Sequence, residues 1–177
     1  MLALGIDPGT AVTGYGVVRR DERNQLHLVE CGVIRTAPRD SLACRLNEIF
    51  EGVTEVVARL RPDALAVEGV FYSRNARTSI TLGHTRGVII LAAARAGLPV
   101  HEFPPAEIKK AVVGAGSATK EQVQFMVARL LRLQQAPSPS DAADGVAAAV
   151  TLLMRSHLPS LQEAIPVRGR SPVSRFA

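Results

Sequence analysis

The stretch LALGIDPGT, residues 2–10, is the strongest indication of the fold, because an apolar run ends in an acid that is followed by Pro-Gly. That pattern predicts a buried strand over residues 2–7 followed by a turn. Residues 14–20 and 26–35 are two further β-prone runs, and the polar tetrad between them predicts a hairpin. The first three strands are therefore expected to form an antiparallel meander.

Helices and strands alternate after this meander. Apolar residues recur three and four positions apart between Ser41 and Arg61, which predicts a long amphipathic helix. The next apolar run, residues 64–68, again ends in an acid, and the crossover through the helix makes it parallel to an earlier strand. The remaining expected elements are a helix over residues 75–97, a strand over 100–103, a helix over 105–113, a helix opened by a Thr119–Gln122 capping box, and a helix over 141–157.

This order predicts an α/β fold with a mixed five-stranded sheet, three antiparallel strands and then two parallel ones, and helices on both faces. The arrangement is that of the ribonuclease-H-like fold, and a fold does not by itself establish a function. Residues 1–157 are expected to form one domain. Residues 158–177 carry three prolines and a net basic charge without any apolar period, which indicates a flexible basic tail.

The charge balance favours a nucleic-acid partner. Lys and Arg number 21 against 16 acids in 177 residues, a net charge of +5, and 18 of these cations are arginines, which bind phosphate bidentately. Two cysteines and four scattered histidines make neither a disulfide framework nor a zinc site. The N-terminus does not resemble a signal peptide, and the longest apolar run is too short to span a bilayer. We therefore expect a cytoplasmic protein without a membrane partner.

Four acidic residues stand where their side chains are able to converge. Asp7 and Glu68 each end a predicted strand, and parallel neighbouring strands bring such carboxylates to the same edge of the sheet. Asp141 and Asp144 are three positions apart at the start of the last predicted helix, which puts them on one face. Each acid alone also fits a turn, a surface charge or a charge at a helix N-terminus.

Four carboxylates at one point repel one another unless a cation lies between them. Hard divalent cations such as Mg²⁺ take oxygen ligands, and two such ions roughly 4 Å apart clamp a phosphoryl group during hydrolysis. In a basic protein, this acidic cluster therefore predicts phosphodiester cleavage.

Six sequence segments together resemble one known family. They are GIDPGT at residues 5–10, TGYG at 13–16, VEGVF at 67–71, GHTRGV at 83–88, VVGAGSATK at 112–120 and DAAD at 141–144. In this order they resemble the RuvC family of bacterial crossover-junction endodeoxyribonucleases, the Holliday-junction resolvases. The resemblance covers roughly residues 1–155 and leaves the tail out.

The resemblance implies a structure-selective endonuclease of recombination and repair, which hydrolyses two opposed strands of a four-way DNA junction and leaves 5′-phosphate and 3′-hydroxyl ends. It implies that Asp7, Glu68, Asp141 and Asp144 are catalytic and bind Mg²⁺, with two ions per site expected and Mn²⁺ as a substitute. Some relatives carry histidine at the third acidic position, where this chain has Asp141. A homodimer is also implied, and a branch-migration motor complex is a further candidate partner.

Aromatic and basic side chains near the acids are candidate DNA contacts. An aromatic side chain beside arginines stacks on an unpaired base at a distorted junction, and two lysines match basic positions of the family pattern. Packing in the core is the alternative for Phe71, and a solvated surface position is the alternative for each lysine. The candidate DNA-binding residues are Phe71, Tyr72, Arg74, Arg77, Lys109 and Lys120.

Other functions stay open at this point. The first alternative is another ribonuclease-H-like nuclease that acts on RNA or on simple DNA. Actin-like and sugar-kinase ATPases share an Asp-x-Gly-Thr opening, although they usually have a second lobe for which 177 residues leave no room. A catalytically silent DNA-binding protein is the third alternative, but such a protein has no chemical reason to carry all four acids.

Overall fold

The computed structural model describes residues 1–69 and 76–155. The strands in this part of the chain are β1 (Leu2–Asp7), β2 (Val12–Arg20), β3 (Leu26–Arg35), β4 (Ala64–Glu68) and β5 (Val100–Phe103). The helices are α1 (Leu42–Leu60), α2 (Ala76–Arg95), α3 (Pro105–Val113), α4 (Lys120–Leu130) and α5 (Ser140–Arg155). None of these helices has the length and apolar content needed to cross a lipid bilayer.

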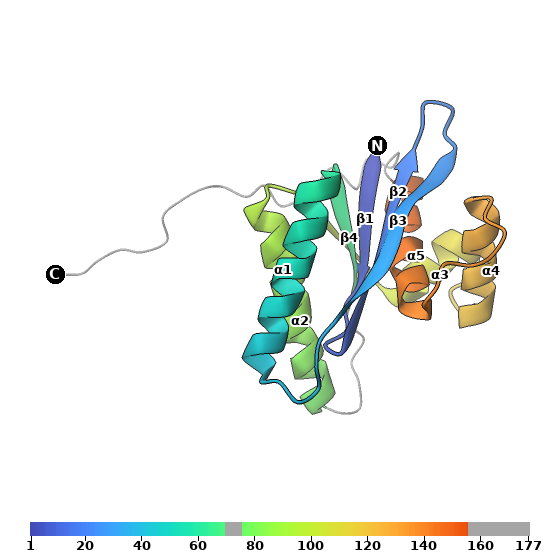
Figure 1. Ribbon diagram of the computed structural model, residues 1–177. Coiled ribbons are helices and arrows are strands. Elements are labelled where there is room, and N and C mark those ends of the chain that lie inside the picture. The colour runs from blue at the N-terminus through green and yellow to red at the C-terminus, as the bar shows by residue number, and fades with distance from the viewer. Residues whose placement is uncertain (70–75, 156–177) are drawn as a thin grey trace.

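The five strands form one mixed sheet in the order β3-β2-β1-β4-β5. The pairs β1–β2 and β2–β3 are antiparallel, whereas β4 runs parallel to both β1 and β5. Figure 1 shows α1 and α2 on one face of the sheet and α3, α4 and α5 on the other. The predicted fold class, with its antiparallel meander, parallel strands and helices on both faces, is confirmed.

The helix ends follow from local hydrogen bonding. The Ser41 hydroxyl accepts a 3.2 Å bond from the Cys44 amide at the start of α1, and Arg61 ends that helix in the left-handed region at φ 49°. Thr119 and Gln122 form the predicted reciprocal capping box at the start of α4. Helix α5 extends to Arg155, the last described residue, so its predicted end near residue 157 and the predicted tail lie outside the described residues.

Strand β2 begins two residues earlier than predicted, at Val12 instead of Gly14. The reason is its pairing with β3, where Val12 lies opposite Arg35 and Thr13 lies opposite Ile34. The backbone ladder therefore continues past the point at which the local β-pattern of the sequence stops.

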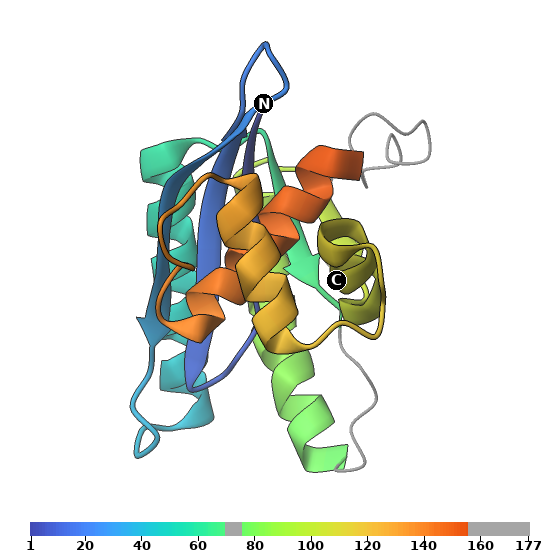
Figure 2. The ribbon, with the colours of Figure 1, turned by 90° about the vertical axis from the view of Figure 1, so that its right-hand side faces the viewer.

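Small and large residues alternate along the neighbouring parallel strands β1 and β4, so the two faces of the sheet differ. In β1 and β4 the small residues face the α5 side of the core, and the large residues face the side covered by α1 and α2. The small set includes Ala3, Ala64 and Ala66, and the large set includes Leu4, Ile6, Leu65 and Val67. Helix α5, which crosses the sheet in Figure 2, is consequently able to approach it closely.

Glycine makes this close approach possible. A Cβ atom on Gly5 would lie 2.1 Å from the carbonyl oxygen of Gly145, which is shorter than any real contact. Backbone therefore meets backbone where α5 crosses β1, and this contact fixes the position of the helix along the strand.

Candidate active site

Two of the four predicted acids lie at the carboxyl ends of neighbouring parallel strands. Ile6 of β1 and Val67 of β4 are partners in the ladder, and Asp7 and Glu68 are the next residues of the two strands. Side chains alternate between faces along a strand, so both acids continue the small-residue series that faces α5. The strand pattern thus directs both carboxylates toward the same helix.

The N-terminus of α5 contributes the other two acids. Gly14 of β2 lies opposite Asp7, and a Cβ atom at this position would come within 1.9 Å of the Asp141 carbonyl oxygen. The missing side chain allows the start of α5 to rest directly on the strand beside Asp7. Asp141 and Asp144 both lie near this helix end, whose dipole stabilises negative charge.

A pocket of about 260 Å³ opens beside these acids. Asp7, Glu68 and Asp144 line it together with Lys109 of α3 and Lys120 of α4, and the remaining lining residues are Pro105, Ile108, Val123 and Ala147. Asp141 is not a lining residue, but its charge acts on both Asp7 and Asp144. One pocket thus combines acidic groups with two amines and an apolar wall.

Burial and mutual repulsion disfavour the charged form of these acids. The pKa of Asp7 is raised to about 7, first by burial and then by the charges of the other three acids, while Lys120 lowers it. The pKa of Glu68 is raised to about 6 by burial and then by Asp144, and the two lysines of the pocket act in the opposite direction. The site therefore carries an excess of negative charge that a bound cation would offset.

Lys120 neutralises part of this excess. Its ammonium group lies 2.7 Å from the Asp144 carboxylate, and the hydrogen bond to Asp144 is the main cause of a raised Lys120 pKa. The pKa of Asp144 is nevertheless raised as well, because burial outweighs its bond to a lysine side chain that is 48% exposed. Lys120 thus offsets only part of the burial and repulsion that raise the pKa values of these carboxylates.

Of the other four predicted DNA contacts, the described part of the chain includes only Arg77. Arg77 is exposed in the first turn of α2 and does not line the acidic pocket. Phe71, Tyr72 and Arg74 lie outside the described residues, so their placement stays a prediction.

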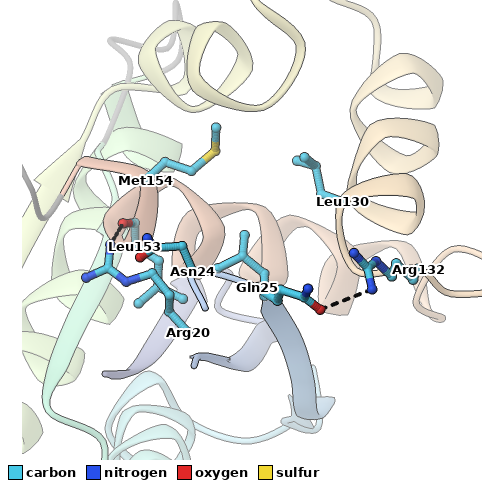
Figure 3. A pocket seen from close by; sticks show the side chains of 8 residues that line it. Arg20, Asn24, Gln25, Leu130, Arg132, Leu153 and Met154 are labelled. Carbon is cyan, nitrogen blue, oxygen red and sulfur yellow. Dashed lines mark hydrogen bonds between the residues drawn. The ribbon is translucent and has the colours of Figure 1, made fainter. Parts of the chain in front are cut away.

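A larger pocket, of about 490 Å³, lies toward the opposite end of the strands (Figure 3). An Arg20 guanidinium nitrogen donates a 2.6 Å bond to the Leu153 carbonyl there, and Arg132 donates a 3.0 Å bond to the Gln25 side chain. The lining residues are Arg20, Asn24, Gln25, Leu26, Leu130, Arg132, Leu153 and Met154. They include no carboxylate, histidine, cysteine or hydroxyl, so the acidic pocket is the better candidate for catalysis.

The donor set of the acidic pocket suits a hard divalent cation, which prefers oxygen ligands and compensates repelling carboxylates. Within residues 1–69 and 76–155, no group of three or more Asp, Glu, His or Cys side chains is arranged so that it could hold a metal ion. The Asp144 carboxylate instead bonds the Lys120 ammonium. The residues nevertheless fit a hard divalent cation by their chemistry and charge.

The mixed sheet, with acids at the ends of β1 and β4 and at the start of the helix that covers them, defines the class of the protein as the ribonuclease-H-like fold with an acidic site at the edge of the sheet. Comparison with known proteins narrows this class. The sequence model of crossover junction endodeoxyribonuclease RuvC matches residues 3–152. The chain belongs to the RuvC family, whose members are metal-dependent nucleases.

Individual relatives agree over most of the chain. The crossover junction endodeoxyribonuclease RuvC of Pelotomaculum thermopropionicum is 49% identical over 150 residues, which cover 85% of this chain and 91% of that protein. The solved RuvC structure from Thermus thermophilus has a TM-score of 0.82 at 36% identity and covers 89% of this chain and 96% of its own. A structure of T. thermophilus RuvC in complex with a Holliday junction substrate also has a TM-score of 0.82, at 34% identity, covering 90% and 98%.

Proposed function

We propose that this chain resolves four-way DNA junctions by hydrolysing one phosphodiester bond in each of two opposed strands, leaving 5′-phosphate and 3′-hydroxyl ends. The observation that carries this proposal is the meeting of Asp7, Glu68 and Asp144 in one pocket, with pKa values raised by burial and mutual repulsion. Family membership supports the endonuclease activity, and the junction complex of the T. thermophilus relative supports the substrate.

Asp7, Glu68, Asp141 and Asp144 are the proposed catalytic and metal-binding residues. We take Mg²⁺ as the cation, two per site, with Mn²⁺ as a substitute, because carboxylate oxygens suit both ions. When bound, the metal supplies positive charge to the attacking water and to the leaving oxygen. Lys120 contacts one carboxylate oxygen of Asp144, so the second oxygen is available to a cation in the pocket.

Lys109 and Lys120 then contact the phosphates of the strand to be cut. Both line the acidic pocket, and the positive charge of each lowers the pKa of Glu68, so both ammonium groups are available to a phosphate bound there. Phe71, Tyr72, Arg74 and Arg77 stay proposed contacts to the distorted junction, on the strength of the family resemblance.

A homodimer through helix α2 would present two such sites to two opposed strands. Ile80 and Leu91 are 61% and 51% exposed, and they share one helix face with Gly83 and Gly87. A Cβ atom on either glycine would meet nothing within 4 Å, so this apolar face is open to a second copy. Sedimentation at micromolar concentration should show a dimer that Leu91→Glu dissociates; a fully active monomer of the unaltered chain would contradict this.

The decisive experiment compares substrates. A synthetic four-way junction, a matched linear duplex and an RNA–DNA hybrid are each incubated with the protein and Mg²⁺. We expect symmetric cuts in the junction alone, and preferential cleavage of the hybrid or the duplex would favour another nuclease of this fold.

Asp7→Asn tests the acids in the same assay. It should abolish cleavage but leave junction binding near the unaltered level, because the basic surface provides the affinity. Glu22→Gln, an exposed substitution in the β2–β3 hairpin, is the control and should cleave normally. An Asp7→Asn protein that cleaves at the unaltered rate would refute the role of Asp7.

A further inference from the structure

The turn that follows Asp7 is held in place by hydrogen bonds from several parts of the chain. The Thr13 hydroxyl donates a 2.7 Å bond to the Gly9 carbonyl, and the Thr36 hydroxyl donates a 2.6 Å bond to the carbonyl of Thr10. The Thr36 amide donates a 3.1 Å bond to the Ala11 carbonyl. Thr13 of β2 and Thr36, the residue directly after β3, therefore secure the backbone of residues 9–11.

Helix α2 holds the same turn through a side chain. The hydroxyl oxygens of Thr10 and Thr85 lie 2.8 Å apart, although 75 residues separate them in the sequence. Thr85 is fully buried, and its hydroxyl also donates a 3.3 Å bond to the Thr81 carbonyl one turn earlier in α2. A hydroxyl has a single proton, so Thr10 is the donor to Thr85 when Thr85 bonds Thr81.

A buried hydroxyl without a partner is costly, and valine has nearly the shape of threonine without that cost. Packing alone would therefore be satisfied by valine at position 85. The Thr85 hydroxyl is used for a contact that reaches out of its own helix, to a residue three positions after Asp7.

We propose that Thr85 is a positioning residue, and that its hydroxyl makes helix α2 an anchor for the turn after Asp7 and so for the direction of the Asp7 side chain. The proposal rests on the catalytic role proposed for Asp7. An anchor is needed because Asp7 is the last residue of β1 and the three other acids repel its charge. If the turn relaxes, Asp7 is free to move away from the pocket.

Three variants separate the hydroxyl from the packing. Thr85→Val keeps the shape and removes the hydroxyl, Thr85→Ser keeps the hydroxyl and loses a methyl group, and Thr10→Val removes the other partner. Cleavage of a four-way junction is measured in single turnover at saturating enzyme, and junction affinity is measured without metal. Thr85→Val should lower the cleavage rate by about 10-fold, since a misplacement of about 1 Å costs up to 10²-fold, while the affinity stays unchanged.

Two further variants, Thr85→Ser and the double variant, distinguish loss of the hydrogen bond from loss of packing. Thr85→Ser should cleave near the unaltered rate, and combining Thr10→Val with Thr85→Val should be no worse than either alone, because both remove one bond. Equal losses in the valine and serine variants, or a rate loss that only follows a loss of affinity, would assign Thr85 to packing and overturn the proposal.

Amide hydrogen exchange tests the anchor without any cleavage assay. The Thr36 amide, which bonds the Ala11 carbonyl, should exchange faster in Thr85→Val and return to normal in Thr85→Ser. The Gly69 amide, which bonds the Phe103 carbonyl on the other side of the site, is the control and should not change. Unchanged exchange at Thr36 in Thr85→Val would overturn the anchor, whereas normal cleavage by Asp7→Asn would instead refute the proposed function.

Discussion

Asp7→Asn should make the metal-free protein more stable at pH 8, although it removes a proposed metal ligand. The folded protein raises the Asp7 pKa from its ordinary value of 3.8 to about 7, mainly by burial. A raised folded-state pKa contributes stability that is present below pH 4 and is lost as the pH rises through 7. The change in pKa corresponds to about 4 kcal/mol at about 1.4 kcal/mol per pH unit, and this is the upper limit of the penalty that asparagine removes.

Urea and thermal unfolding in EDTA measure this effect. At pH 8 we expect the Asp7→Asn protein to be about 2–4 kcal/mol more stable than the unaltered protein, a rise in melting temperature of roughly 5–10 °C. At pH 5 the gain should fall to less than half, because the folded-state Asp7 is then already protonated. Added Mg²⁺ should stabilise the unaltered protein more than the variant, since a ligand stabilises the state that binds it.

The exposed substitution Glu22→Gln also removes one negative charge and should produce none of these differences. An Asp7→Asn protein that is less stable than the unaltered protein in EDTA at pH 8 would refute the reasoning. It would show that the ionised Asp7 side chain stabilises the folded protein, whereas our reasoning requires that it destabilises the metal-free protein.

Three further predictions concern the two lysines of the acidic pocket, the packing of α5 on β2, and the C-terminal tail. Replacing Lys109 and Lys120 together with alanine should lower the single-turnover rate at saturating enzyme by up to about 10²-fold, because the scissile strand loses its alignment; an unchanged rate would remove both lysines from the site. Gly14→Ala should lower the melting temperature and the cleavage rate, since its Cβ would lie 1.9 Å from the Asp141 carbonyl, whereas Gly83→Ala, which meets nothing within 4 Å, should leave the melting temperature near normal. Deleting residues 158–177 should leave cleavage mostly intact. It should lower the slope of the logarithm of the junction-binding constant against the logarithm of salt concentration by no more than about two. A deletion variant that does not cleave would place the important DNA contacts in the tail.

Local patterns were sufficient for most of the secondary structure. The apolar runs that become β1 and β4 each end in an acid, and the capping residues Ser41 and Thr119 stand where α1 and α4 begin. These features depend on neighbours within about four positions along the chain, which is the range that periodicity and capping rules cover. The sequence pattern places the start of β2 two residues too late, because Val12 and Thr13 are strand only through their partners in β3.

The sequence also contained more of the site than the motifs alone suggest. In β1 and β4 the small residues alternate with large ones, and Asp7 and Glu68 fall in the small-residue series. Strand periodicity is therefore enough to predict that both acids lie on the same face of the sheet. That α5 covers this face follows only from the packing.

Only the tertiary structure decided which groups meet at the acids. By itself the sequence determined the order of the strands and helices, the identity of the four acids and the excess of arginine. The packing of α5 against β1, the bond from Lys120 to Asp144 and the contact between Thr10 and Thr85 join residues that lie far apart in the chain. Such contacts depend on how whole elements pack, and the raised pKa of Asp7 follows from the burial and charge that this packing creates.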